Sequence, residues 1–136
     1  MTSRVLCIRH GETAWNATGR WQGHAPVPLN EAGLAQSRQL GVYLASSGLR
    51  VSAIYSSDLK RAMQTAQAIA GALRLEPQPD PRLREVDLGC WQGLTRQEAE
   101  AWDNKRYTAY RADWYDTPPP DGESRNHLKA RARAAF

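Results

Sequence analysis

Residues 5–11 read VLCIRHG, an apolar run that ends abruptly in two basic side chains and a glycine. Four consecutive apolar residues rich in β-formers are typical of a strand buried on both faces of a parallel sheet. Val51 to Tyr55 predicts a second short strand, and Leu75 to Pro81 predicts an extended edge strand, because sheet edges tolerate proline. Short strands separated by helical segments indicate the α/β class with a parallel sheet.

Helical segments are predicted between and after these strands. The clearest period lies in residues 59–73, where apolar side chains recur at helical spacing on one face. Residues 56–58 (SSD) offer N-cap side chains for it, and Thr95 followed by Glu98 has the spacing of a capping box. The other expected helices are residues 30–47 with Asn30 as N-cap, an aromatic segment at 102–115, and a last helix from about Glu123.

Composition places the chain among ordinary globular proteins. Its 136 residues fit one domain, with 41% hydrophobic and 24% charged residues. No apolar run is long enough to span a membrane and no secretory leader follows Met1, so we expect a cytoplasmic protein without a membrane partner. The net charge of +4 suits an anionic small molecule, and no nucleic-acid-binding motif accompanies it. Cys7 and Cys90 form no disulfide or zinc pattern and are expected to be small apolar fillers.

Three residues at the end of the first predicted strand are candidates for catalysis and ligand binding. Ligands bind at the carboxyl ends of strands in open parallel sheets, where Arg9, His10 and Gly11 are expected to lie. Arginine offers a planar fork of donors for a phosphoryl group, neutral imidazole is a nucleophile, and glycine lets backbone approach an anion. The triplet alone leaves a second interpretation open, in which these side chains make ordinary hydrogen bonds.

Four ordered blocks extend this pattern along the chain. They are RHGETAWNATGRWQG with PLNEAG (residues 9–23 and 28–33), YSSDLKRA (55–62), LREVDLGCWQG (83–93) and PDGES (120–124). In this order they resemble the histidine phosphatase superfamily, the phosphoglycerate mutase-like proteins. The resemblance implies a three-layer sandwich around a parallel sheet, formed by residues 1–136 as one domain that is incomplete at its C-terminus.

The resemblance also implies a mechanism centred on His10. This histidine would attack the phosphorus of a phosphomonoester and form a phosphohistidine intermediate. Arg9 and Arg61 would hold the phosphoryl oxygens during in-line transfer, and Asn16 would add a phosphate contact. Without the resemblance, Arg61 would be interpreted as a solvated cation on a helix face.

Glu85 matches the family's general acid and base. It would protonate the leaving alcohol oxygen and then accept a proton from the attacking water. Its alternative interpretation is a surface glutamate paired with Arg82 or Arg84. Gln22 and Gly23 are expected to line the substrate pocket.

The sequence departs from the family pattern in one respect. The proteins it resembles carry a second active-site histidine, followed by glycine, at the end of a later apolar strand. The other histidines here are His24, in a Gly/Pro-rich loop, and His127, in a polar helix, and neither matches that position. We therefore expect an incomplete member of the family. The favoured explanation is that the recorded chain of a normal enzyme ends early; the alternatives are a natural truncation that leaves a damaged protein, or a partner chain that supplies the missing strand. From these 136 residues alone we expect very weak turnover, with phosphate binding left open.

Three functions follow from these observations. The leading hypothesis is a metal-independent phosphomonoester phosphatase acting on a small phosphorylated metabolite, without a cofactor. A phosphoglycerate mutase would use the same phosphohistidine and would need a bisphosphoglycerate primer. A non-catalytic phosphate-ligand binding module is the third, because the second histidine is missing. Phosphatase is preferred over mutase because residues 95–120 are compact, whereas similar mutases carry an extra segment there. A homo-oligomer stays open.

Overall fold

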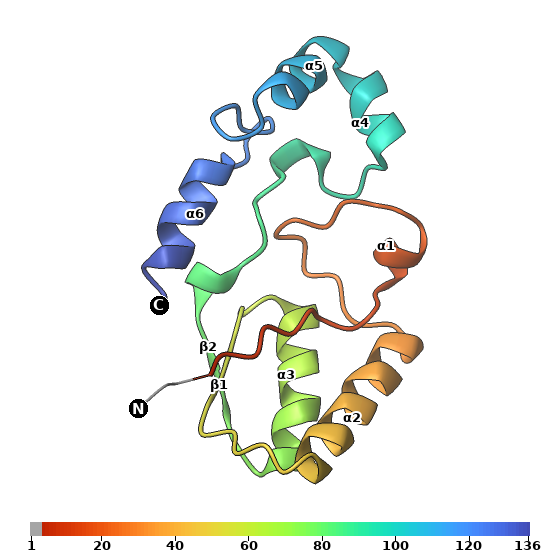
Figure 1. Cartoon of the computed structure of the whole chain (residues 1–136). Helices are drawn as coiled ribbons and strands as arrows, with labels where there is room; N and C mark the ends of the chain where they lie inside the picture. The colour runs from red at the N-terminus through yellow and green to blue at the C-terminus, as the bar shows by residue number, and fades with distance from the viewer. Residues whose placement is uncertain (1–3) are drawn as a thin grey trace.

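The computed structural model describes residues 4–136. Figure 1 shows two parts, a lower one in which α2 and α3 lie beside two short strands, and an upper one that holds α4, α5 and α6. In chain order the elements are α1 (Ala14–Ala17), α2 (Glu31–Ser46), β1 (Ile54–Ser56), α3 (Lys60–Leu73), β2 (Pro77–Pro79), the 3-10 helices η1 (Pro81–Leu83) and η2 (Gly89–Trp91), α4 (Arg96–Trp102), α5 (Asn104–Ala112) and α6 (Arg125–Arg133).

The two strands form a parallel pair joined by α3. Ile54 lies opposite Pro77, and Ser56 lies opposite Pro79. Proline lacks the N–H group that an inner strand needs to pair on both sides. β2 has a neighbour on one side only, and it therefore accommodates two prolines. The strand–helix–strand unit confirms the α/β class. β2 lies within the predicted range Leu75 to Pro81, whereas β1 is shorter than the predicted strand Val51 to Tyr55 and ends one residue later, at Ser56.

The strand predicted at residues 5–8 does not form. Residues 4–10 have no regular secondary structure, and the side chains of Val5, Leu6 and Ile8 are 67%, 54% and 43% exposed. A strand buried on both faces needs a neighbouring strand and a layer of side chains on each face. Within residues 4–136 this segment pairs with neither β1 nor β2, so it stays outside the sheet and its apolar side chains remain in contact with solvent.

The expectation that the cysteines fill the core is also wrong. Cys7 and Cys90 are both exposed and unpaired. Cys7 belongs to the segment that forms no strand, and the Cys90 thiol donates to Oδ2 of Asp121 at 3.1 Å. That carboxylate raises the pKa of the Cys90 thiol, because a negative neighbour disfavours the thiolate.

Two of the three predicted N-caps form. The Asn30 side chain accepts the Gly33 N–H at 2.8 Å, and Thr95 forms the expected capping box at the start of α4. The exception is α3, whose N-cap is Leu59, with no side-chain cap. The predicted cap residue Asp58 instead pairs with Arg84, a contact between segments that local sequence does not reveal.

An aromatic core holds the loop before α4 against the upper part. Trp91 is fully buried, and its ring packs edge-on against Tyr110, with the two centroids 5.1 Å apart. Trp21 and Tyr107 stack beside it. This core brings the segment around residue 91 and the loop that follows α1 into one packed unit. No helix within residues 4–136 has the length and apolar character needed to cross a bilayer.

Candidate active site

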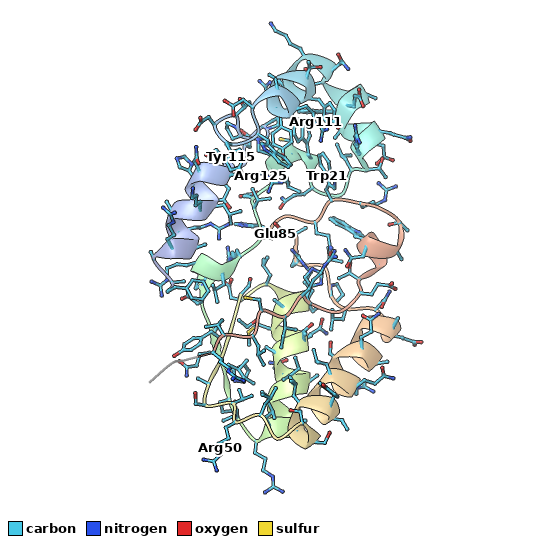
Figure 2. The ribbon with its side chains drawn as sticks, viewed as in Figure 1. Trp21, Arg50, Glu85, Arg111, Tyr115 and Arg125 are labelled. Carbon is cyan, nitrogen blue, oxygen red and sulfur yellow. The ribbon has the colours of Figure 1, made fainter. Side chains whose placement is uncertain are left out.

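The seven residues proposed for the site all line one open hollow. This hollow has a volume of about 1510 Å³ and extends from β1 and α3 in the lower part to α5 and α6 in the upper part, with Glu85 between them (Figure 2). Its lining includes the exposed apolar segment at residues 5–8 as well as polar side chains. The candidates that it brings together are Arg9, His10, Asn16, Gln22, Gly23, Arg61 and Glu85.

His10 is held with one ring nitrogen available for chemistry. Its Nδ1 lies 2.7 Å from the carbonyl oxygen of Gly11. Because a carbonyl can only accept, Nδ1 carries the proton, and Nε2 of the neutral ring presents its lone pair. The Nε–H group of Arg61 donates to this Nε2 at 3.2 Å. The nucleophilic atom and the guanidinium therefore face each other.

Arg61 is a buried cation rather than a solvated helix residue. Its side chain is 2% exposed, although it lies in the first turn of α3. Nη2 donates to the carbonyl of Gly23 at 2.8 Å, and Nη1 donates to the carbonyl of Ala25 at 3.2 Å. Three of its five N–H donors are thus used within the protein, and two remain for a ligand. The interpretation of Arg61 as a surface charge is wrong.

Close packing of the backbone fixes the loop that carries His10 and Gly11. The Gly11 N–H donates to the hydroxyl of Thr65, which itself donates to the carbonyl of Arg61 one helical turn earlier. A Cβ atom on Gly11 would lie 2.4 Å from the carbonyl oxygen of Gly33. The loop and the cation are therefore joined through Thr65, for which no role was predicted.

Asn16 and Gln22 are tied to the same short helix. The Oδ1 atom of Asn16 accepts the Thr13 N–H at 3.0 Å and completes the capping box of α1. The Thr13 hydroxyl also lies 2.8 Å from Oε1 of Gln22, which is buried. The oxygen of Asn16 is thus used locally, and its amide nitrogen donates no hydrogen bond within residues 4–136, although the residue lines the hollow.

Glu85 approaches the hollow from the other part of the fold, unpaired with any arginine. Its Oε1 accepts the N–H of Val86 at 2.9 Å. The two arginines considered as partners bind elsewhere, Arg82 to Asp80 and Arg84 to Asp58. The surface ion pair proposed as an alternative for Glu85 is therefore not formed.

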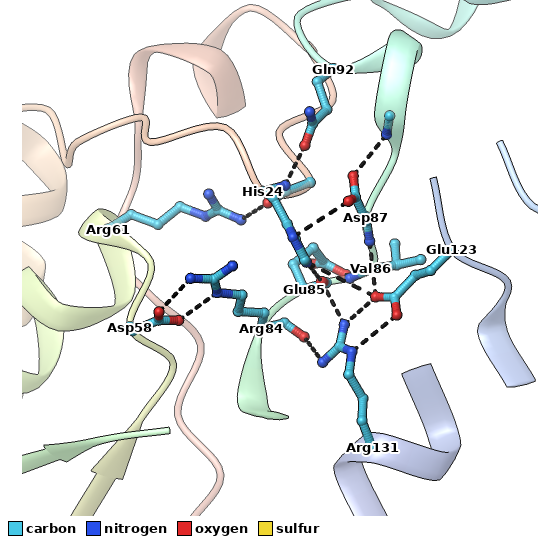
Figure 3. Close-up of polar contacts among 12 residues, drawn as sticks. His24, Asp58, Arg61, Arg84, Glu85, Val86, Asp87, Gln92, Glu123 and Arg131 are labelled. Carbon is cyan, nitrogen blue, oxygen red and sulfur yellow. Dashed lines mark hydrogen bonds and ion pairs between the residues drawn. The ribbon is translucent and has the colours of Figure 1, made fainter. Parts of the chain in front are cut away.

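Arg131 of α6 holds the backbone of the Glu85 loop (Figure 3). Its guanidinium donates to the carbonyl oxygens of Arg82, Arg84 and Glu85, at 2.9, 2.7 and 2.8 Å. Nε of Arg131 also donates to Glu123 at 3.0 Å. Burial opposes the charge on Glu123, but the Arg131 hydrogen bond and the Asp87 N–H outweigh it and lower the pKa of this carboxyl group. No local sequence pattern indicates this clamp, by which Arg131 holds residues 82–85, since Arg131 lies 46 to 49 positions away from the residues it holds.

His24 takes part in the same clamp (Figure 3). Its Nε2 donates to the carbonyl of Glu85 at 2.8 Å, and its Nδ1 lies 3.6 Å from Oδ2 of Asp87. His24 therefore positions the loop and does not line the hollow, and His127 is exposed in the first turn of α6. Within residues 4–136, no second histidine faces His10.

The electrostatic environment keeps His10 uncharged. Burial lowers the pKa of His10 below its ordinary value of 6.5, the Gly11 hydrogen bond opposes this, and the charges of Arg61 and Arg9 lower it further. Burial also lowers the pKa of Arg61, which the Glu85 carboxylate partly offsets. Arginine stays protonated at any working pH, so the site pairs a neutral imidazole with a permanent cation.

We expect the His10 ring to titrate below pH 6.5 in the folded chain. Because the native state holds the neutral ring, the unfolded chain binds the proton first, and stability falls as pH drops from about 6.5 through the lowered pKa. Proton NMR of the ring hydrogens over pH 4–8 would measure this, with the chain in urea as reference. A native midpoint at or above that of the unfolded chain would contradict it.

Comparison with known proteins assigns the family. The model of the histidine phosphatase superfamily (branch 1) matches residues 5–136. The chain belongs to the histidine phosphatase superfamily. Among relatives of this histidine phosphatase chain, "Phosphoglycerate mutase-like protein 4" of Arabidopsis thaliana is 42% identical over 136 residues, which are 98% of this chain and 59% of that protein.

Solved structures of the superfamily share the fold. The alpha-ribazole phosphatase from Shigella flexneri has a TM-score of 0.84 at 29% identity, over 94% of this chain and 62% of that one. A mycobacterial glucosyl-3-phosphoglycerate phosphatase in complex with VO3 has a TM-score of 0.80 at 36% identity, over 93% and 61%. The histidine phosphatase chain described here thus spans 59–62% of the length of these relatives. Within residues 4–136, no three His, Cys, Asp or Glu side chains cluster closely enough to hold a metal ion.

Proposed function

We propose that this histidine phosphatase chain transfers the phosphoryl group of a phosphomonoester to Nε2 of His10 and then to water. The observation that carries the proposal is the state of the imidazole. The Gly11 carbonyl fixes the proton on Nδ1, while Nε2 presents its lone pair toward the buried guanidinium of Arg61. A neutral, oriented nucleophile beside a fixed cation is the arrangement that phosphoryl transfer needs.

In the first step, the lone pair of Nε2 attacks phosphorus as the bond between phosphorus and the alcohol oxygen breaks. The remaining donors of Arg61, with Arg9 and the amide of Asn16, bind the equatorial oxygens. Glu85 is the general acid that gives a proton to the leaving oxygen. Positive charge develops on the ring, and the Nδ1–H bond to Gly11 strengthens as it does so.

In the second step, water attacks phosphorus opposite the histidine. The Glu85 carboxylate accepts a proton from this water as the bond between Nε2 and phosphorus breaks. Inorganic phosphate leaves and the neutral ring is restored. The clamp formed by Arg131 and His24 supports this role, since it fixes the backbone of the residue that must serve both steps.

A mutase would differ only in the acceptor of the second step. The name of the Arabidopsis relative favours this second candidate. There the hydroxyl of a bound phosphorylated acid replaces water, and a bisphosphoglycerate primer charges His10 initially. A chain that binds phosphate without transferring it is the remaining alternative, because no second histidine lines the hollow within residues 4–136.

Turnover of p-nitrophenyl phosphate, followed by release of inorganic phosphate, tests the proposal. We expect slow release of phosphate that is independent of added phosphoglycerate. Isomerisation of phosphoglycerate that requires the bisphosphorylated primer would favour the mutase instead. Phosphate binding with no phosphorylated histidine under any of these conditions would favour the binding module and would overturn the proposed hydrolase.

A further inference from the structure

Two paired residues lie directly beside the site and have no role in the chemistry proposed above. Arg84 precedes the general acid Glu85, and its partner Asp58 lies three residues before the phosphate-binding arginine of α3. Nε of Arg84 donates to Oδ1 of Asp58 at 2.6 Å, and Nη2 donates to Oδ2 at 2.5 Å. Two parallel bonds of this kind fix the relative orientation of the two groups. The Asp58–Arg84 pair therefore joins the segment of Glu85 to the start of α3 (Figure 3).

The segment that carries Glu85 has little other support on the side of α3. Glu85 lies between η1 and η2, in a stretch without regular secondary structure. Within residues 4–136, the hydrogen bond to its carboxyl group comes from Val86, in the same segment. Arg131 binds the backbone of this segment, but from α6, in the upper part of the fold. The position of Glu85 relative to α3 therefore depends on contacts that cross to the lower part.

A second contact of this kind runs through residues 23–25. The carbonyl oxygens of Gly23 and Ala25 accept hydrogen bonds from Arg61. The ring of His24, between them, donates to the carbonyl of Glu85 at 2.8 Å. Both this contact and the Asp58–Arg84 pair hold the backbone or the neighbour of Glu85, and neither touches its carboxyl group. Both therefore act on where the carboxyl group lies and leave its oxygens available.

Stability of the fold does not account for the Asp58–Arg84 pair. The two side chains are 26% and 36% exposed, and ion pairs this exposed contribute little to the free energy of unfolding. An aspartate at the start of α3 would stabilise the helix as its N-cap, yet the N-cap is Leu59, which has no capping side chain. Hydrogen bonds from Arg84 lower the pKa of Asp58, so the carboxylate stays charged and paired at neutral pH. The residue predicted as a helix cap joins two segments instead.

We infer that Asp58 and Arg84 are positioning residues, which hold the general acid at a fixed distance from the phosphoryl group. This inference rests on the proposed function, because it concerns the step in which Glu85 gives a proton to the leaving oxygen. In that step the bond between phosphorus and the alcohol oxygen breaks, and the proton goes to this oxygen. Without the pair, the segment of Glu85 shifts relative to α3, while His10 can still attack. The loss of rate therefore grows with the need of the leaving group for a proton.

Two phosphate esters of similar size separate this role from a structural one. p-Nitrophenolate leaves readily without a proton, whereas the alkoxide of benzyl phosphate needs one. The ratio kcat/KM covers the steps up to cleavage of the ester bond, so hydrolysis of the phosphohistidine does not enter it. In the full chain, Asp58→Asn and Arg84→Gln should each lower kcat/KM by about tenfold for benzyl phosphate and by less than about twofold for p-nitrophenyl phosphate.

A double variant and a matched control complete the design. Asp58→Asn combined with Arg84→Gln should lose no more than either change alone, because the two side chains act as one unit. Asp80→Asn is the control, since it breaks the ion pair of Asp80 with Arg82, which stays within one segment. It should leave the ratio of kcat/KM for the two esters unchanged.

The inference is overturned by equal losses for the two esters, by losses that multiply in the double variant, or by the same selective loss in Asp80→Asn. Failure of both single variants to fold would also overturn it, because the pair would then serve stability. Glu85→Gln tests the proposed function separately and should lower kcat/KM for benzyl phosphate by about 100-fold or more. If Glu85→Gln spares this ester, the proposed general acid fails. A selective loss in Glu85→Gln that the Asp58 and Arg84 variants do not share overturns this inference alone.

Discussion

Replacing His10 with alanine should lower the turnover of p-nitrophenyl phosphate by about 10⁴-fold or more, because the covalent route is lost together with the atom that forms the bond to phosphorus. In the structure, Nε2 of His10 faces Arg61 at 3.2 Å, and no other histidine lines the hollow within residues 4–136. Steady-state kinetics of the variant, measured beside the unmodified chain, checks this expectation.

His127→Ala is the matched control for this variant. His127 lies exposed in α6, outside the hollow, and should tolerate the change with unaltered turnover. Phosphate affinity of the His10 variant should fall far less than its turnover, since Arg61 and Arg9 remain at the hollow. Undiminished turnover in His10→Ala would show that another group attacks phosphorus.

Replacing Arg61 with methionine should weaken both the site and the fold. The carbonyls of Gly23 and Ala25 would each lose a charged donor. An unsatisfied buried carbonyl costs about 1–3 kcal/mol, so we expect the free energy of unfolding to fall by about 2–5 kcal/mol. Phosphate affinity should fall by about 100-fold, because the buried cation supplies charge-assisted bonds that water cannot replace.

Urea unfolding and phosphate calorimetry measure these two effects separately. Lys60→Met is the control, since Lys60 is the neighbouring residue of α3 and is exposed. It should change stability by less than about 0.5 kcal/mol and leave phosphate binding intact. Equal phosphate affinity in the Arg61 and Lys60 variants would mean that Arg61 stabilises the loop of Gly23 and does not bind phosphate.

The residues of the candidate site could be predicted from the sequence, but most of the contacts among them could not. His10 and Arg61 lie about 50 residues apart, and the ordered blocks identified both. The burial of Arg61 could not be predicted, because a helix-face pattern gives only the position of a side chain on its own helix. Its acceptors are the backbone carbonyls of Gly23 and Ala25. Every residue has a backbone carbonyl, so residue types do not show which carbonyl will accept a hydrogen bond.

The clamp on Glu85 escaped prediction for a similar reason. Arg131 binds three backbone oxygens and one carboxylate, that of Glu123. His24 was considered only as a candidate for a second catalytic histidine, yet it donates to the backbone of Glu85. The PDGES block, which contains Glu123, is the one sequence feature that indicates a role for this region.

The fold shows where local patterns succeed and where they fail. Helix caps such as Asn30 and the Thr95 capping box depend on a few adjacent residues, and both were predicted correctly. The strand at residues 5–8 depends on partners elsewhere in space, and its apolar residues stay exposed in their absence. Apolar runs report the tendency to be buried in a sheet, but pairing decides whether a strand forms.

Trapping the phosphorylated chain tests the central claim most directly. The chain would be mixed with a phosphomonoester, quenched in base and digested, and the peptide containing His10 examined by mass spectrometry. We expect one added phosphoryl group on that peptide, on Nε2 by NMR, stable in base and lost in acid. A phosphoryl group on a different residue, or on Nδ1 of His10, would contradict the account.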